Sequence, residues 1–205
     1  ALARTDEPHL DADEKVVTDT LTVTLADFND APVLIPVNPQ MGTTDEHTPL
    51  SVAVGSFVTG VSDPDGSSQL QGIVVVSASG LGLWEYSLGG GYVPLFPVSA
   101  AQALVLGPGS LLRYTPDQLN GEVAAVTYRA WDTTDGASVG DRVDASEFGG
   151  STAYSAATDS GWVEVTDIND APVLAPQSPV MGTTDVITPF TVALNQFVGG
   201  ITDID

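Results

Sequence analysis

Apolar and polar residues alternate with a period of two along much of the chain. The pattern is regular in TLTVTL at 20–25 and in PLSVAV at 49–54, where Leu50, Val52 and Val54 share one face. This is the period of a β-strand that buries one face, because successive side chains point to opposite sides of the strand. Further β-branched and aromatic runs are separated by the turn sequences DPDG, GGG, GPG and NG. The pattern therefore predicts strands almost throughout.

Two stretches are expected to differ from the strands. SAAQALVL at 99–106 is the one segment that could form a short helix, with Ser99 as its N-cap. The stretch at 137–156 is polar, and we expect it to be a long excursion between the last two strands. With about seven strands in one unit, the predicted fold is all-β, an antiparallel β-sandwich with immunoglobulin-like topology.

The chain contains an internal repeat. DFNDAPVL at 27–34 recurs as DINDAPVL at 167–174, and MGTTDEHTPLSVAV at 41–54 recurs as MGTTDVITPFTVAL at 181–194. Both pairs are offset by 140 residues (27 to 167, 41 to 181). A fixed offset of this length indicates tandem structural units. We therefore divide the chain into the end of one unit at 1–30, a complete unit at 31–170 and the start of a third unit at 171–205.

The charge of the chain is strongly negative. It contains 27 acidic and 5 basic residues, which gives a formal net charge of -22, while 42% of its residues are hydrophobic. The charge argues against nucleic acid as a partner, because phosphate binding requires clustered lysine and arginine. The hydrophobic content argues against disorder. The acidic residues therefore belong to a folded protein, whose self-repulsion bound cations would reduce.

Cysteine is absent, so neither disulfides nor thiolate metal sites can form. No apolar run approaches the roughly 18 residues of a membrane span. The N-terminus has no signal-peptide pattern, and the chain opens within a repeat. We therefore expect a segment of a longer protein, without a membrane span, whose targeting signals would lie outside it.

The repeated Asp-x-Asn-Asp segment suits a calcium ion. Calcium binds 6 to 8 oxygens at about 2.3–2.6 Å, from carboxylates, amides, backbone carbonyls and water. In an extended segment Asp63 and Asp65 would point the same way. The alternative is that Asp-Pro-Asp-Gly serves only as a turn. The second copy favours calcium, because Ile204 replaces Pro64 while both aspartates of the motif persist.

The order of the motifs resembles a known family. DPDG at 63–66 follows the first Asp-x-Asn-Asp segment, YRAWDTTDG at 128–136 precedes the final strand, and VTDINDAPVL at 165–174 closes the unit. In this order they resemble a cadherin-like repeat, and in particular are similar to the tandem repeats of very large secreted bacterial adhesins and other surface proteins. The resemblance implies a cadherin-like sandwich whose motifs meet at the joints between units and bind Ca²⁺, giving a stiff, rod-like array.

The resemblance also implies which residues bind calcium at each joint. At the first joint they are Asp27, Asn29, Asp30, Asp63, Asp65 and Asp132, with Asp135 as an alternative to Asp132. At the second joint they are Glu46, Asp167, Asn169, Asp170, Asp203 and Asp205. We expect the tighter ion at the first joint, where Asp63, Asp65 and Asp132 would converge. The sequence departs from the family in two ways: Val186 stands at the counterpart of Glu46, and the mid-domain Asp-Arg-Glu motif has no clear equivalent, although Asp117 and Glu122 lie in that region.

The predicted function is that of a calcium-binding structural spacer in an extracellular bacterial surface protein, such as the stalk of an adhesin. A component of an extracellular sheath or filament is an alternative. The expected partners are calcium ions and neighbouring repeats, and the partial terminal units could self-associate through unpaired strand edges. Catalysis is not expected, because His9 and His47 are the only histidines and neither lies in a recognised triad, with His47 expected in solvent.

Carbohydrate binding is a further alternative. Trp84, Tyr86 and Leu88 would share one face of a strand, and aromatic rings stack on sugars, although such a stripe is more often core. Trp162 replaces the outward-facing counterpart Thr22, so it should lie on the surface or in a contact between repeats. Trp131 is expected to pack beneath the first joint.

Overall fold

The computed structural model describes residues 28–66, 72–196 and 198–205, and this part of the chain is almost entirely β-structure. The described helices are one turn of α-helix, α1 (Val54–Phe57), and one 3-10 turn, η1 (Leu194–Gln196). The strands are β1 (Val33–Leu34), β2 (Gln40–Asp45), β3 (Leu50–Ala53), β4 (Val61–Ser62), β5 (Gly72–Ser79), β6 (Leu83–Ser87), β7 (Val93–Pro94), β8 (Ala103–Leu106), β9 (Leu111–Thr115), β10 (Glu122–Trp131), β11 (Arg142–Val143), β12 (Asp159–Thr166), β13 (Val173–Leu174) and β14 (Ile201–Thr202). The predicted all-β class is confirmed. No helix among these residues is both long and apolar enough to cross a membrane.

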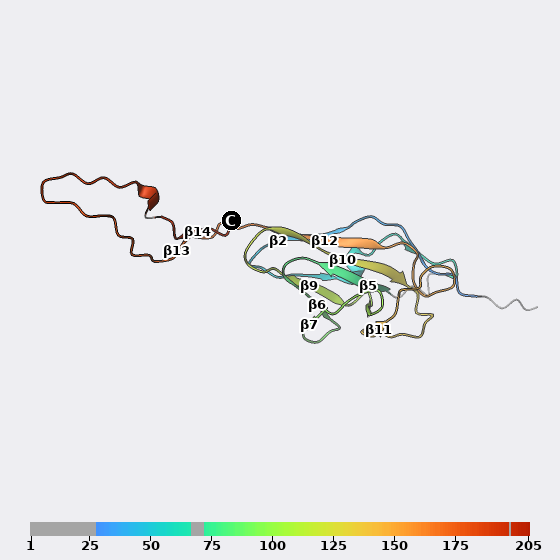
Figure 1. Ribbon diagram of the computed structural model, residues 1–205. Coiled ribbons are helices and arrows are strands. Elements are labelled where there is room, and N and C mark those ends of the chain that lie inside the picture. The colour runs from blue at the N-terminus through green and yellow to red at the C-terminus, as the bar shows by residue number, and fades with distance from the viewer. Residues whose placement is uncertain (1–27, 67–71, 197) are drawn as a thin grey trace, which may run out of the picture.

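Two larger sheets form the body of the molecule (Figure 1). One has six strands in the order β11-β8-β5-β10-β12-β2, and the other has four strands in the order β3-β9-β6-β7. Neighbouring strands are antiparallel with one exception, because β2 runs parallel to β12 with Val163 opposite Gly42. The expectation of a purely antiparallel fold is therefore wrong at this edge, where β2 joins the sheet after the chain crosses over from β1.

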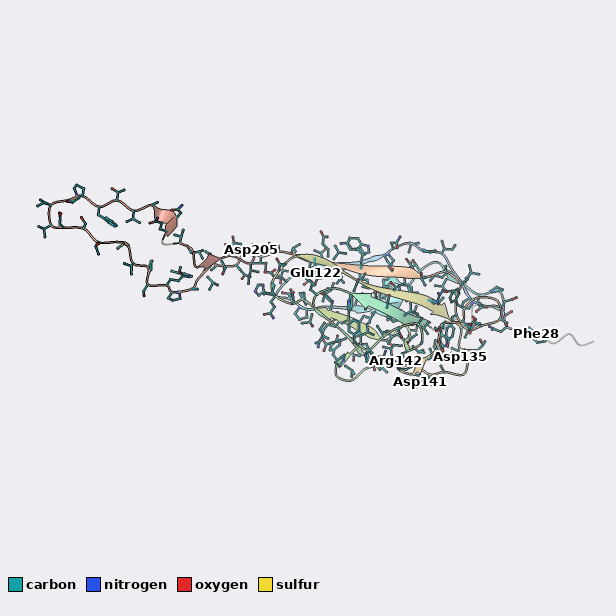
Figure 2. The ribbon with its side chains drawn as sticks, in the orientation of Figure 1. Phe28, Glu122, Asp135, Asp141, Arg142 and Asp205 are labelled. Atoms are coloured by element: carbon teal, nitrogen blue, oxygen red, sulfur yellow. The ribbon has the colours of Figure 1, made fainter. Side chains whose placement is uncertain are left out.

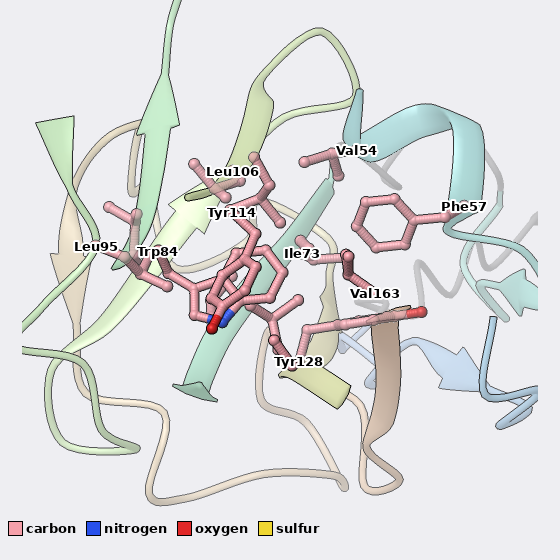
Figure 3. Close-up of a cluster of buried hydrophobic side chains, with 14 of the residues drawn as sticks. Val54, Phe57, Ile73, Trp84, Leu95, Leu106, Tyr114, Tyr128 and Val163 are labelled. Carbon is pink, nitrogen blue, oxygen red and sulfur yellow. The ribbon is translucent and has the colours of Figure 1, made fainter. Parts of the chain in front are cut away.

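The main hydrophobic core lies between the two sheets (Figure 3). Trp84 and Tyr114 pack with ring centroids 4.8 Å apart, and Phe57 meets Tyr128 edge to face at 5.8 Å. Trp84 is 1% exposed, so it belongs to the core. Leu88 lies beyond the end of β6 and is exposed. It therefore does not share a face of the strand with the buried Trp84, and the stripe considered from the sequence does not form a surface feature.

A second core covers the outer face of the six-stranded sheet. Val74, Val105 and Trp131 project from this face and pack against Ala145 and Tyr154 of the excursion. The excursion at 137–156 does lie between the last two long strands, as predicted. It is not merely polar, however, because its small apolar residues and one tyrosine cover the outer face of the sheet. Both faces of β8, and of β5 from Ile73 to Val75, are consequently buried.

The predicted helix at 99–106 is wrong. Residues 99–102 form a turn in which the Gln102 N–H donates to the Ser99 carbonyl at 3.0 Å, and β8 follows directly. All four residues of β8 are buried, since β8 lies between β5 and β11 with a core on each face. A strand covered on both faces shows no alternation, and a short apolar run of this kind cannot be told from a helix by its pattern.

The segment at 171–205 extends from one end of the sandwich (Figure 1). Val173 pairs with Thr202 here, which repeats the pairing of Val33 with Ser62 after the 140-residue offset. The described residues 180–193, which are the counterparts of β2 and β3, form no strand. Their apolar side chains are largely exposed, because β2 and β3 are held by pairing with β12 and β9 in the complete unit.

Candidate metal centres at the two ends of the sandwich

The acidic motifs gather at opposite ends of the sandwich. Figure 2 shows Phe28 and Asp135 at one end and Asp205 beyond the other. We use "first joint" for the end formed by 28–31 and the loops at 63–66, 132–136 and 149–154. We use "second joint" for the end formed by 45–47, 167–170 and 203–205. Asp27, predicted for the first joint, lies outside the described residues.

The loop at 63–66 turns back on itself at the first joint. Asp63 Oδ1 accepts a hydrogen bond from the Asp65 N–H at 2.9 Å, and the Gly66 N–H donates to the Asp63 carbonyl at 3.2 Å. Asp65 Oδ2 then accepts from the Asp30 N–H at 2.7 Å. The expectation that Asp63 and Asp65 point the same way from an extended segment is therefore wrong, because they lie in a turn. The turn nevertheless brings Asp65 to the Asp-x-Asn-Asp segment, as predicted.

Asp132 is the most deeply buried acid of the first joint. It follows β10 directly and has no exposed surface. Its Oδ1 accepts from the Thr134 N–H at 2.9 Å and hydroxyl at 2.7 Å, while its Oδ2 accepts from Asn29 Nδ2 at 3.1 Å. The same Asn29 nitrogen lies 3.1 Å from the Thr152 carbonyl oxygen and 3.4 Å from that of Ser151. Carboxylate and carbonyl oxygens from two separate segments thus converge on the amide nitrogen of Asn29, which belongs to a third segment.

Asp135 is already engaged by its own loop and by the excursion. Its Oδ1 accepts from the Trp131 indole N–H at 2.9 Å and the Ala137 N–H at 3.1 Å, and its Oδ2 accepts from the Tyr154 hydroxyl. Partial burial raises the pKa of Asp135, but these hydrogen bonds outweigh it and leave the pKa below the ordinary value. Asp135 therefore ties the second core to the first joint. Trp131 packs beneath this joint, as predicted.

Glu46 is the central residue of the second joint. It occupies the turn that follows β2, where its N–H donates to the Thr166 carbonyl at 3.2 Å. The side chain has no exposed surface, and neither carboxylate oxygen has a hydrogen-bond partner. Burial raises the pKa of Glu46 and the nearby charges of Asp167 and Asp170 raise it further, while the backbone N–H of Ile168 and the His47 side chain lower it by a smaller amount. An acceptor placed this way needs a positive charge or a donor.

The segment after β12 repeats the arrangement of the first joint. The Asp170 N–H donates to Asp205 Oδ2 at 2.7 Å, which is the counterpart of the bond from Asp30 to Asp65. Asp167 Oδ1 accepts from the Gly121 N–H at 3.0 Å, and Asn169 Nδ2 donates to the Asp170 carbonyl at 2.8 Å. Asp203 is exposed. Most predicted residues of the second joint therefore surround the same end of the sheet.

The two joints differ in how closely their ligand atoms gather. In the described part of the chain, one group of three or more His, Asp and Glu residues has all its ligand atoms within 4.8 Å of one another: Glu46, His47 and Asp170. The described carboxylates of the first joint form no such group, and Asp63, Asp65 and Asp132 each accept hydrogen bonds from N–H groups. His47 was not among the residues predicted for this joint, although its position next to Glu46 was a usable signal.

Two other acids considered from the sequence are held by local hydrogen bonds. Glu122 accepts from the Leu81 N–H at 2.8 Å and from the Tyr114 hydroxyl, whose pKa is raised by burial and by this bond. Asp117 Oδ1 accepts from the Leu119 N–H at 3.1 Å. Both acids therefore serve the connection between β9 and β10.

The backbone carbonyls of Ser151 and Thr152 were also missed, and no sequence signal could have revealed them. Any backbone carbonyl can bind a cation, and only the path of the excursion brings these two to Asn29.

The comparisons with family models, with curated proteins and with solved structures found no match to this chain.

Proposed function

We propose that the chain is a calcium-binding, cadherin-like spacer repeat of an extracellular bacterial surface protein, in which ions at the two joints stiffen the array. One observation carries the proposal. Four buried side-chain nitrogen or oxygen atoms lack a hydrogen-bond partner in the described residues, and three of them are carboxylate oxygens at the joints: both oxygens of Glu46 and Oδ2 of Asp63. The fourth is Nε of Arg129.

A buried carboxylate without a donor is unfavourable, because it loses its hydration and gains no interaction in return. A cation bound between these acids would restore that interaction. The donors available at both joints are carboxylate, amide and carbonyl oxygens. Hard cations prefer this set, and calcium tolerates its irregular arrangement better than magnesium, which requires a near-octahedral shell.

The arrangement of the sheets supports the spacer role. The parallel pairing of β2 with β12 and the two facing sheets are compatible with the immunoglobulin-like topology that the resemblance implies. The joints lie at opposite ends of the sandwich (Figure 2), so successive units would meet end to end. With a net charge of -22, ions at each joint would also reduce the repulsion between neighbouring units.

The extracellular location rests on the resemblance alone, and a sheath or filament component would use the same joints. No specific observation favours carbohydrate binding. Trp84 is buried in the core, and the half-buried Trp162 donates its indole N–H to the Asn38 carbonyl at 3.1 Å.

Differential scanning calorimetry with calcium and with excess chelator tests the proposal. A ligand that binds only the folded state stabilises it, by about 2.7 kcal/mol per site at a hundredfold excess over Kd. We expect calcium to raise the melting temperature of the wild type, and the double variant Glu46→Gln with Asp63→Asn to lose most of this rise. Glu164→Gln is the matched control, because it removes one exposed charge from β12. A melting temperature that does not respond to calcium would refute calcium binding.

A further inference from the structure

We infer that Glu46, His47 and Asp170 bind a borderline divalent cation such as zinc through one nitrogen and several oxygens. This site differs in kind from the first joint, whose ligands are all oxygens. The inference uses residues of the second joint, but it does not require calcium to bind there. Zinc and calcium would compete for the carboxylates that both sites need.

The turn after β2 places the three side chains together. The Thr48 N–H donates to the Asp45 carbonyl at 3.2 Å and the His47 N–H donates to Asp45 Oδ1 at 3.0 Å, which closes a β-turn. Glu46 and His47 are the central residues of this turn. Asp170 approaches from the segment after β12, because β2 and β12 run parallel and their C-terminal ends lie side by side.

The spacing of the ligand atoms fits a small ion. His47 Nδ1 lies 3.6 Å from Glu46 Oε1, and all three ligand atoms lie within 4.8 Å of one another. Two ligands bound at about 2.1 Å to a tetrahedral zinc ion lie about 3.4 Å apart. The glutamate and histidine therefore stand near the required separation, and the Asp170 carboxylate needs only a side-chain adjustment to join them.

A second and independent observation points to a ligand at this position. The Glu46 carboxylate is fully buried and directed into the group, and both of its oxygens lack a partner. The side chain of His47, in contrast, is 48% exposed, which leaves a path for an ion from solvent. The group therefore combines an unsatisfied buried anion with an accessible nitrogen.

The chemistry of histidine determines which ion this group prefers. Imidazole nitrogen binds zinc, copper and nickel well, whereas calcium takes oxygen ligands. Zinc binds both imidazole nitrogen and carboxylate oxygen, and water can complete the shell around three protein ligands. The first joint has no histidine among its described residues and should not share this preference.

The unit that begins at 171 has neither the glutamate nor the histidine at the equivalent positions. Val186 and Ile187 occupy the positions of Glu46 and His47, and both are exposed. The mixed site is therefore a property of the joint that follows the complete unit. It is not a general feature of the repeat.

Metal titrations can isolate the contribution of His47. All proteins would carry His9→Gln, so that His47 is the only histidine. Zinc binding would be measured by calorimetry near neutral pH, and cobalt binding by its visible absorption, which reports nitrogen ligation and low coordination number. The variants are His47→Gln and Asp170→Asn, with Glu164→Gln as the charge control and circular dichroism as the check on folding.

We expect one zinc ion per chain and a visible cobalt spectrum in the His9→Gln protein. His47→Gln should weaken zinc binding at least tenfold and abolish the cobalt bands while leaving calcium affinity unchanged, and Asp170→Asn should weaken both metals. Equal zinc affinity with and without His47, or the absence of cobalt bands in the parent, would overturn the inference. Loss of calcium binding alone would refute the proposed function and leave this site intact.

Discussion

Asp159 offers a sharp test of how the fold positions the second joint. It begins β12 and is 2% exposed. Its Oδ2 accepts from the Val37 N–H at 3.1 Å and from the Tyr128 hydroxyl at 3.2 Å, and its Oδ1 accepts from the Asn38 N–H at 2.9 Å. These bonds hold the crossing segment that leads into β2. Since Glu46 follows β2 directly, Asp159 indirectly positions this proposed metal ligand.

The Asp159→Ala substitution removes the acceptor for four donors, because the Ser160 N–H also donates to Asp159 Oδ1 at 2.8 Å. Hydrogen bonds to charged groups contribute about 1.5–3 kcal/mol each, but the three backbone N–H groups are only partly buried and can recover water. We therefore expect Asp159→Ala to lower the free energy of unfolding by about 3–5 kcal/mol, a large part of the roughly 5–15 kcal/mol that is typical of a domain. Asp159→Asn keeps one acceptor oxygen and should cost about half as much.

Urea unfolding at equilibrium would measure these changes, with Tyr128→Phe as the partner substitution. The Tyr128 hydroxyl donates to the same carboxylate, so the double variant should cost less than the two single variants together. If Asp159→Ala costs less than about 1 kcal/mol, or if the two positions are additive, the carboxylate does not anchor the crossing segment and the reasoning is wrong.

Three further predictions concern the joints and the second core. In a calorimetric calcium titration, Asp65→Asn should weaken the tightest step more than Asp205→Asn, and the reverse order would contradict a tighter first joint. The pKa of Asp135 is lowered in the folded state, so its charge stabilises the fold above the ordinary carboxyl pKa, and this stabilisation is lost as the pH falls through the folded-state pKa. The difference in melting temperature between the wild type and Asp135→Asn should therefore become smaller in acid. Trp131→Ala should cost about 3–5 kcal/mol in urea unfolding, and Trp162→Ala, at a partly buried position, clearly less; equal losses would argue against a second core.

The sequence alone revealed the features that depend on local pattern. The period of two identifies strands because a strand's side chains alternate regardless of what covers them. The 140-residue offset identifies equivalent positions. It correctly relates the pairing of Val33 with Ser62 to the pairing of Val173 with Thr202. The motif order also indicated which acids lie at the ends of the unit, since strand ends and turns carry them.

Only the tertiary structure decided what covers each strand. β8 was mistaken for a helix because both of its faces are buried, one by the main core and one by the excursion. The excursion has a polar sequence overall, because its buried apolar residues, such as Ala145 and Tyr154, are scattered along it. They form part of a core only where they pack against Trp131. Burial of this kind depends on partners distant in sequence, and no local pattern records it.

The second joint shows the same division. The resemblance placed Glu46 and Asp170 among the expected ligands, and the sequence correctly predicted an exposed His47 but gave it no role. The parallel pairing of β2 with β12 carries the turn after β2 to a segment more than 100 residues further along the chain, and it buries the Glu46 carboxylate there without a donor. The chain topology brings Glu46 close to the segment after β12. Desolvation by the surrounding atoms then leaves its carboxylate in need of a donor or a cation.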